Sequence, residues 1–248
     1  MAILPTAVTR PVRSLDAMGA CAACAIRELS VCSVLSANEL TRLCTIVSTV
    51  NLDAGRTVIN EGEPAGDLFN VVRGSVKLYK LLSDGRRQVT GFLFPGDFLG
   101  IALNDTYAYS GEAIEPLQLC RFPRKKLETL LAELPRLERK LLGTTAHELA
   151  AAQDQMVLLG RKTAKERVAS FLVSLSERAV KRRRPALPLD VPMSRTDIAD
   201  FLGLTTETIS RTLTQLRRAR LIATNERNRI DILNLEGLKE LVDGTTDD

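Results

Sequence analysis

The chain has 248 residues, a net charge of +4 and 45% hydrophobic residues, values typical of a protein with two folded domains. It has no apolar run near the roughly 18 residues of a membrane-spanning helix and no signal-peptide pattern, so we expect a cytoplasmic location. Residues 161–248 hold 17 basic and 13 acidic residues, whereas residues 1–160 hold 17 of each, so any affinity for phosphates is expected in the C-terminal part.

Residues 1–20 have no clear period and are expected to form a mobile lead-in. Cys21, Cys24 and Cys32 follow with the spacing C-x2-C-x7-C. Thiols at such spacing in a cytoplasmic protein hold zinc or an iron–sulfur cluster rather than forming disulfides. Zinc is the usual interpretation where two C-x2-C pairs lie close together, and this sequence has no second pair.

Ser36 and Glu39 have the spacing of a capping box, which predicts a helix over residues 36–48. Its inward residues are expected to be Leu40, Leu43 and Val47. Cys44 falls in the same apolar pattern and is predicted to lie in the core.

Between Asn51 and Phe122, glycines separate short runs rich in Val, Leu, Phe and Tyr, a pattern that predicts a β-sandwich or β-barrel. Ser83-Asp84-Gly85 lies between two such runs and predicts a hairpin turn. The predicted strands include Leu68–Val72, Val76–Leu81, Val89–Phe94 and Leu117–Phe122, the last of which contains Cys120.

A long helical pattern begins at Pro135 and reaches about Gly160. Leu137 and Leu141 can pack back on the β domain. The other side carries residues at alternating steps of three and four, as in a coiled-coil seam: Leu142, Thr145, Leu149, Ala152, Met156 and Leu159. We expect a second copy of the helix to cover this seam, the alternative being one wide core-facing stripe. The only histidine, His147, lies off the seam and is expected at the surface.

A further amphipathic helix is predicted over residues 164–180, with Val168, Phe171, Leu172 and Leu175 inward. We expect the basic run Lys181–Pro185 that follows to form a solvated loop, the alternative being that it contacts phosphates. Leu187–Val191 is predicted to be a strand.

Residues 194–213 have the pattern of two short helices around a turn. Ser194 and Asp197 match a capping box, Gly203 supplies a left-handed end, and Thr205 caps the second helix. That helix has an apolar stripe of Ile209, Leu213 and Leu216, and a polar face of Glu207, Ser210, Arg211 and Thr214. Arginine can bond guanine, glutamate the cytosine amino group, and serine either kind of base. The stretch therefore predicts a helix-turn-helix that reads DNA, the alternative being a helical hairpin with a solvated face.

Leu221–Thr224 and Arg229–Leu233 predict a β-hairpin beside this motif, followed by a short helix and an acidic tail over Gly237–Asp248. Such a hairpin would be a wing whose turn residue Arg227 can reach the DNA backbone. The complete set of predicted DNA contacts is Ser194, Thr205, Thr206, Glu207, Ser210, Arg211 and Arg227.

Over about residues 20–240 the chain resembles the Crp–Fnr regulators, in particular their oxygen-sensing fumarate-and-nitrate-reduction branch. The segments that carry the resemblance are the cysteine cluster, Gly91-Phe92 with Gly96-Asp97, Cys120, the long helix, Ala164–Leu175 and Leu202–Arg211. The resemblance implies an α+β fold with an N-terminal β-roll (a cyclic-nucleotide-binding-like jelly roll), a long dimerisation helix and a C-terminal winged helix-turn-helix.

The resemblance also implies the domain organisation. We expect a cluster-binding segment over residues 1–35, a β-roll sensor domain over 36–134, the dimerisation helix over 135–161 and the DNA-binding domain over 162–248. The Glu-x-x-Ser-Arg pattern is characteristic of the branch that binds TTGAT half-sites, arranged as an inverted repeat, as a homodimer.

The resembling regulators hold a [4Fe–4S] cluster, and the matching residues here are Cys21, Cys24, Cys32 and Cys120. Oxygen would attack this cluster and thereby signal. The gap of seven before Cys32 is longer than in some relatives, and one loop can absorb it. Ser83–Arg87 matches the hairpin by which family activators touch RNA polymerase.

The sequence also bears on three other functions. Cyclic-nucleotide-binding relatives need an arginine beside a small hydroxyl residue, and residues 104–112 contain no arginine, so we expect no cyclic nucleotide. An iron–sulfur enzyme lacks support because there is no P-loop, no G-x-G-x-x-G and no histidine acid–base pair, so we expect no catalysis. A regulator whose cysteines hold zinc remains an alternative, as does nitric oxide in place of oxygen as the signal.

Overall fold

The computed structural model describes residue 21 and residues 23–101, 105–182, 188–225 and 229–244. The chain divides into two compact units. The first contains residues 1–80 and 90–150, and the second contains residues 81–89 and 151–248. Four predicted features lie outside the described residues: the lead-in, the end of the basic run, the wing turn with Arg227, and the last four residues.

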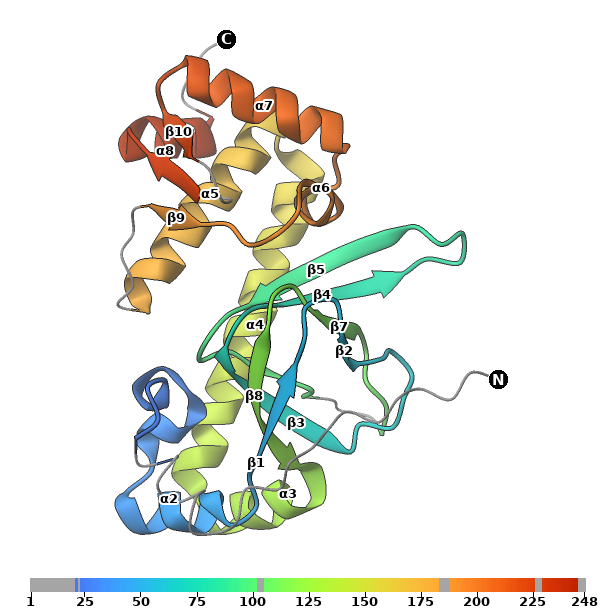
Figure 1. The fold of residues 1–248 in the computed structure, drawn as a ribbon, viewed down its shortest axis with the longest axis vertical. Coiled ribbons are helices and arrows are strands. Elements are labelled where there is room, and N and C mark those ends of the chain that lie inside the picture. The colour runs from blue at the N-terminus through green and yellow to red at the C-terminus, as the bar shows by residue number, and fades with distance from the viewer. Residues whose placement is uncertain (1–20, 22, 102–104, 183–187, 226–228, 245–248) are drawn as a thin grey trace. The chain divides into compact units, whose positions relative to one another are not determined.

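The first unit is built on two four-stranded sheets, with strand orders β1-β8-β3-β6 and β2-β7-β4-β5 (Figure 1). Within each sheet, all the strand pairs that the structure describes are antiparallel. The strands are β1 (Ser48–Leu52), β2 (Thr57–Ile59), β3 (Asp67–Arg73), β4 (Val76–Leu81), β5 (Arg87–Leu93), β6 (Phe98–Leu99), β7 (Ser110–Ala113) and β8 (Leu117–Pro123). This arrangement confirms the predicted β-roll.

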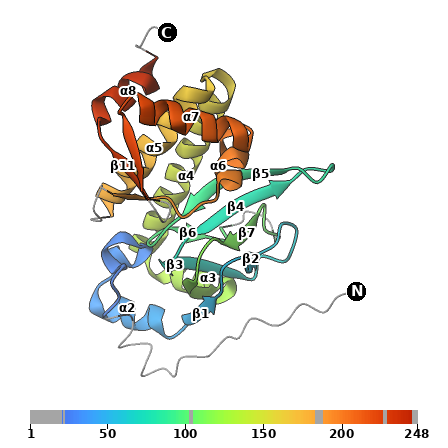
Figure 2. The same cartoon turned by 45° about the horizontal axis from the view of Figure 1, so that its top comes forward.

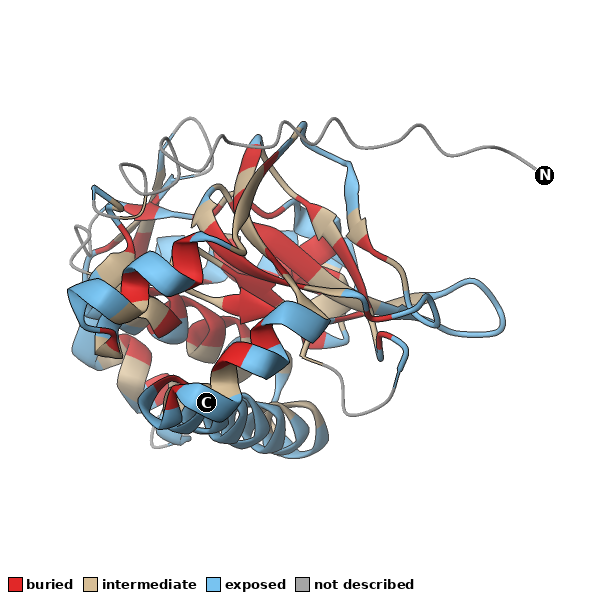
Figure 3. Ribbon diagram, turned by 90° about the horizontal axis from the view of Figure 1, so that it is seen from below, coloured by how far each residue is buried: buried red, intermediate tan, exposed pale blue. Residues whose placement is uncertain are grey.

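Side chains on the first sheet alternate between two cores, because successive residues of a strand point to opposite faces. Leu117 and Leu119 of β8 join Val71 of β3 in one buried cluster. Phe122 of β8 joins a second cluster with residues of the helices, and Cys120 packs against it. Every strand of the two sheets contributes at least one buried residue (Figure 3). The alternation therefore points Cys120 toward the helical side.

Helical segments cover that side of the first sheet. They are η1 (Arg27–Leu29), η2 (Val31–Val34), α2 (Ala37–Cys44), α3 (Arg124–Glu133) and the start of α4 (Pro135–Arg161), where η denotes a 3-10 helix. The capping box of Ser36 and Glu39 is present, as predicted. The predicted end of this helix is wrong, because α2 ends at Cys44 and the β-branched residues that follow lead into β1. Helix α3 was not predicted.

Helix α4 has two different sides. Leu137 is completely buried and Leu141 packs against the same core, which confirms the predicted inner side. On the other side Leu142, Leu149 and Met156 are 70%, 62% and 71% exposed. Such exposure of long apolar residues along one helix marks a surface that binds another molecule.

The second unit contains α5 (Ala164–Lys181), β9 (Leu189–Asp190), α6 (Arg195–Leu202), α7 (Thr206–Arg218), β10 (Ile222–Asn225), β11 (Arg229–Ile232) and α8 (Leu235–Asp243). Its sheet has the order β10-β11-β9. Helices α6 and α7 flank one turn, and β10 and β11 form the hairpin after them (Figures 1 and 2). The winged helix-turn-helix is thus confirmed. No helix of the described residues is long and apolar enough to cross a membrane.

Candidate functional site

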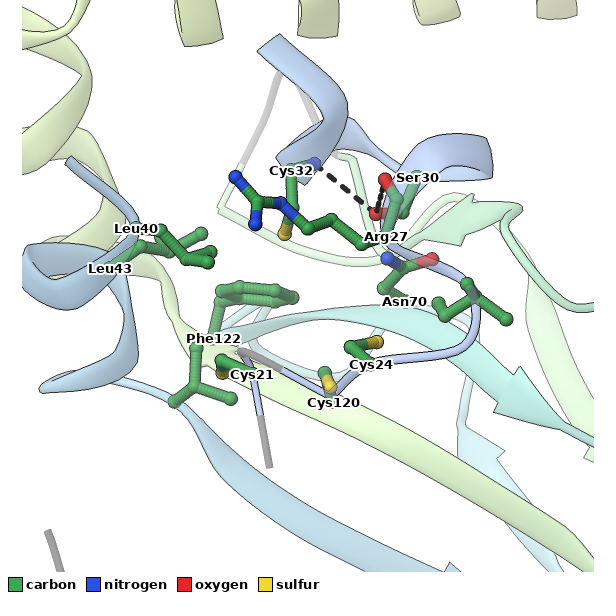
Figure 4. A pocket seen from close by; sticks show the side chains of 12 residues that line it. Cys21, Cys24, Arg27, Ser30, Cys32, Leu40, Leu43, Asn70, Cys120 and Phe122 are labelled. Atoms are coloured by element: carbon green, nitrogen blue, oxygen red, sulfur yellow. Dashed lines mark hydrogen bonds between the residues drawn. The ribbon is translucent and has the colours of Figure 1, made fainter. Parts of the chain in front are cut away.

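One pocket of the first unit is lined by all four cysteines that were predicted to bind a cluster (Figure 4). Cys21 and Cys24 precede η1, Cys32 lies in η2, and Cys120 lies in β8. The other residues around the pocket are largely apolar, among them Leu40, Leu43 and Phe122, and about 350 Å³ between them is not filled by atoms, part of it open to solvent. We call this the thiol pocket.

Local hydrogen bonds shape the segment that carries three of the thiols. The backbone N–H of Arg27 donates to the carbonyl oxygen of Cys24 at 3.1 Å, which begins the η1 turn. The Ser30 hydroxyl caps η2 by accepting the backbone N–H of Cys32 at 3.2 Å. These short turns point Cys24 and Cys32 to the same pocket although seven residues separate them.

A glycine of the β-roll lets this segment pack closely. Gly96 has a φ of +99°, and a Cβ atom there would lie 2.8 Å from the Cβ of Leu29. Any other residue would be strained and would collide with the segment. The two buried residues Val31 and Leu35 then fix the segment to the core.

Burial raises the pKa of the Cys21 and Cys120 thiols to about 12 and that of Cys32 to about 11. These thiols are therefore protonated at neutral pH, and a metal that binds them must displace the protons. Cys44 is 3% exposed and lies in the core, as predicted.

The arrangement of the thiols restricts the metal group that fits. Among the described residues, no three cysteine, histidine or acidic side chains are placed to hold a single metal ion. A zinc site needs its sulfurs about 2.3 Å from one point. A four-iron cluster instead takes one thiolate at each of four separate irons, so its ligands need only surround a pocket. Four thiols around one pocket match the donor set of such a cluster.

In the second unit, the helix-turn-helix is built as its sequence predicts. Ser194 caps α6 in a capping box with Asp197, and Gly203 ends the helix with a φ of 62°. Thr205 caps α7 by accepting the backbone N–H of Thr208 at 3.1 Å. The predicted apolar stripe of α7 is buried, namely Ile209, Leu213 and Leu216.

The opposite face of α7 is open to solvent. Thr205, Thr206, Glu207, Ser210 and Arg211 are all exposed. In the described part of the chain, neither the Glu207 carboxylate nor the Arg211 guanidinium forms a hydrogen bond or ion pair. The Ser210 hydroxyl donates to the carbonyl oxygen of Thr206 at 2.9 Å, so its oxygen remains as an acceptor.

The other two predicted DNA contacts, Ser194 and Arg227, are not part of this open face of α7. Ser194 is exposed, but its hydroxyl already donates to the Asp197 carboxylate at 2.6 Å and accepts the backbone N–H of Asp197 at 3.0 Å. Arg227 lies outside the described residues. The structure thus presents five of the seven predicted contacts on one surface.

The tip of the β4–β5 hairpin belongs to the second unit and contacts α6, an interaction that the sequence did not indicate. The Arg87 guanidinium lies 3.0 Å from the Asp197 carboxylate and 2.9 Å from that of Asp200. The Gln88 side chain donates to the carbonyl oxygen of Asp200 at 2.6 Å. We call these contacts the Arg87 clamp. The clamp engages the same Asp197 that closes the capping box, and so holds the start of α6.

The segment that binds the cyclic phosphate in nucleotide-binding relatives is different here. Tyr107 is 7% exposed within the core between the sheets, and its hydroxyl donates to the carbonyl oxygen of Asp67 at 2.8 Å. The Tyr109 hydroxyl accepts the backbone N–H of Gly100 at 3.2 Å. In the described part of this segment, both tyrosine hydroxyls are thus bonded to the backbone.

Comparison with known proteins identifies both parts of the chain. Residues 166–241 match the family model of the Crp-like helix-turn-helix domain, and residues 49–133 match that of the cyclic nucleotide-binding domain. The chain is 43% identical over 203 residues to the nitrogen fixation regulation protein FixK of Bradyrhizobium diazoefficiens, covering 82% of this chain and 86% of that protein. It is 38% identical over 224 residues to the transcriptional activator FnrL of Cereibacter sphaeroides, covering 89% and 90%.

A solved structure, that of FixK2 from Bradyrhizobium japonicum, is also similar. It superposes with a TM-score of 0.73 at 38% identity and covers 79% of this chain and 97% of that one.

Proposed function

The chain belongs to the Crp–Fnr family of DNA-binding transcription activators, which are not enzymes, and on this premise we propose that it senses oxygen through a [4Fe–4S] cluster. The ligands are Cys21, Cys24, Cys32 and Cys120. The observation that carries the proposal is that these four cysteines, three from the segment 21–32 and one from β8, line one pocket. A cytoplasmic location is part of the proposal.

The cluster would supply an oxygen-reactive centre, and this chain's own residues would connect it to the fold. Three of its ligands lie on the segment 21–32, whereas Cys120 belongs to the sheet. Loss of the cluster would remove the connection that it makes between the cysteines of that segment and Cys120 of β8. The freed segment is then held only by its packing and hydrogen bonds, and this change is the signal.

Anaerobic purification tests the cofactor directly. We expect a brown protein with broad visible absorption, containing iron and acid-labile sulfide in equal amounts at four of each per chain. A colourless protein that contains zinc in place of iron would overturn the cluster and favour the zinc-binding alternative. Nitric oxide can be added to the same sample in place of air, to learn which gas is the signal.

The exposed face of α7 is proposed to read a TTGAT half-site in the major groove. Arg211 has no partner among the described residues and lies in the N-terminal half of the helix, the part that a recognition helix inserts. Glu207 and Ser210 both offer acceptor oxygens, which suit amino groups of cytosine or adenine. Thr205 and Thr206 are positioned for the phosphates that flank these bases.

Replacing Arg211 by alanine should reduce discrimination at the guanine-containing base pair by about 1–3 kcal/mol. The expected cause is loss of the bidentate contact to guanine. Operator binding is measured on the full site and on sites with each base pair changed. Changing Arg227 should instead weaken binding to all sequences alike. An Arg211→Ala protein that binds weakly but keeps its sequence preference would show that Arg211 contacts only phosphate.

An inverted-repeat site requires a two-fold dimer, and the exposed seam of α4 is proposed as its interface. Leu142, Thr145, Leu149, Ala152 and Met156 are exposed. Leu159, at the end of the seam, is half-buried, and its Cδ2 would lie 3.3 Å from a Cβ at Gly203. The last seam residue therefore packs on the helix-turn-helix and links the seam to the turn between α6 and α7.

Ala152 lies in the middle of the seam, at the position where some family members have an acidic residue that weakens the cluster-free dimer. A neutral residue here removes that repulsion. Oxygen is therefore proposed to act partly by reorienting helices rather than only by separating the dimer. Sedimentation with and without the cluster tests this: a clean conversion to monomer in air would contradict it.

Changing Ala152 to aspartate should weaken the air-exposed dimer more than the cluster-loaded one. Two like charges facing each other in a partly buried seam cost on the order of 1 kcal/mol or more. Asp154 is exposed and off the seam, so Asp154→Ala serves as the control and should leave the dimer unchanged. Dissociation constants from sedimentation of the four samples, two variants in each state, give the comparison. An equal effect of Ala152→Asp in both states would mean that the cluster does not act on the seam.

RNA polymerase is proposed as a further partner. The hairpin tip is exposed from Leu82 to Arg86, whereas Arg87 is occupied by α6. Within this turn the backbone N–H of Arg86 donates to the Asp84 carboxylate at 3.0 Å. An exposed turn of this kind is suited to contact a second protein.

A further inference from the structure

Asn70 is an amide in the wall of the thiol pocket (Figure 4). It lies on β3 directly opposite Cys120 of β8 in the antiparallel register. Opposed residues in such a pair share one face of the sheet and have Cβ atoms about 4.5–5.5 Å apart. Asn70 is therefore one of the two residues directly opposite the one proposed ligand that comes from the sheet, the other being Thr49 of β1.

The surroundings of Asn70 do not satisfy its amide. The residue is 2% exposed, and its Oδ1 atom has no hydrogen-bond partner in the described part of the chain. Residues of the same face, Leu68, Phe98 and Phe122, are apolar and belong to the core. A buried polar group without a partner lowers stability, so its presence in a core indicates a partner that is absent from the polypeptide.

We infer that the Asn70 amide donates an N–H hydrogen bond to sulfur, either the Cys120 thiolate or an adjacent sulfide of the cluster. This inference rests on the proposed function, because the acceptor sulfur belongs to the cluster or to one of its ligands. A half-turn of the asparagine amide exchanges the positions of its oxygen and its nitrogen. The NH2 group can therefore face the pocket. Asn70 is thus a positioning residue and not a ligand.

A donor at this position changes the properties of the cluster. Hydrogen bonds to cluster sulfurs are among the factors that set the reduction potential, because they stabilise the more negatively charged state. Partners outside the ligand set also hold ligands in place, and their loss typically weakens metal binding about 10–100-fold. Asn70 should therefore raise the potential and slow the loss of Cys120 from the cluster.

The inference predicts opposite effects in the two states of the protein. Without the cluster, Asn70→Leu removes an unsatisfied amide from an apolar core and should raise the Tm by about 2–6 °C. With the cluster, the same change removes a donor, so the reduction potential should fall and the cluster should be lost in air about tenfold faster. A residue with a purely structural role would shift both states in the same direction.

The experiment compares anaerobically reconstituted wild type, Asn70→Leu and Asn70→Val. Valine is included because it suits a β-strand and is smaller than leucine. Asn51→Leu is the matched control, since Asn51 is an exposed asparagine on β1 of the same sheet. Reduction potential, bleaching in air and the Tm of the cluster-free protein are measured.

Unchanged potential and bleaching in both Asn70 variants, or a lowered Tm without the cluster, would overturn the inference. Failure of the wild type to bind any cluster would instead overturn the proposed function, so the two failures are distinguishable.

Discussion

Replacing Cys120 by serine should abolish cluster binding, leaving no iron after anaerobic reconstitution. Cys120 is the only proposed ligand in the sheet, and the other three lie on the segment 21–32. Serine has nearly the same size but lacks the thiolate that holds iron. We expect the same complete loss for Cys21→Ser, Cys24→Ser and Cys32→Ser, measured as iron and sulfide per chain.

Cys44→Ser is the matched control for this series. Cys44 is 3% exposed in the adjacent core and does not line the thiol pocket. The Cys44→Ser protein should therefore keep its full iron content. Full iron in Cys32→Ser or Cys120→Ser, or loss of iron in Cys44→Ser, would show that the ligand set is wrong.

Replacing Arg87 by alanine should lower the unfolding free energy of the second unit by about 2–5 kcal/mol. The Asp197 side chain is 7% exposed, and the substitution removes a guanidinium that lies 3.0 Å from its buried carboxylate. Operator affinity should fall as well, because the clamp holds the start of α6.

The neighbouring arginine provides the control. Arg86 is 76% exposed and pairs with Asp84, which is 49% exposed, so Arg86→Ala should cost no more than about 1 kcal/mol. Denaturant unfolding of both variants gives the comparison, and Asp197→Asn added to Arg87→Ala should recover part of the loss. Equal stability of the Arg86 and Arg87 variants would mean that the clamp does not stabilise the second unit.

The helix-turn-helix could be predicted closely because its signals are local. Ser194 starts α6 with its side-chain cap, Gly203 ends it with its left-handed backbone, and the stripe of α7 is set by helical spacing. Helix α3 was missed although Leu127 and Leu130 are buried at helical spacing. It follows Pro123 directly and has no side-chain cap, so the usual mark of a helix start is lacking.

The sites depend more on contacts between distant parts of the chain. Cysteine spacing alone indicated a metal site, but the register that sets Asn70 opposite Cys120 depends on the pairing of β3 with β8. The Arg87 clamp joins residues that are 110 positions apart. No periodicity or motif in the sequence identifies such partners, because they are determined by how whole sheets and helices pack.

The central claim is that the cluster in the thiol pocket controls binding of DNA by α7. Its most direct test is the affinity of one anaerobic sample for a TTGAT inverted repeat, measured before and after exposure to air, with a scrambled site as the control. We predict that air lowers the affinity for the inverted repeat by roughly 5–150-fold, the usual range of coupling between two sites, and leaves binding to the scrambled site unchanged. Equal affinity before and after complete loss of the cluster would contradict the account.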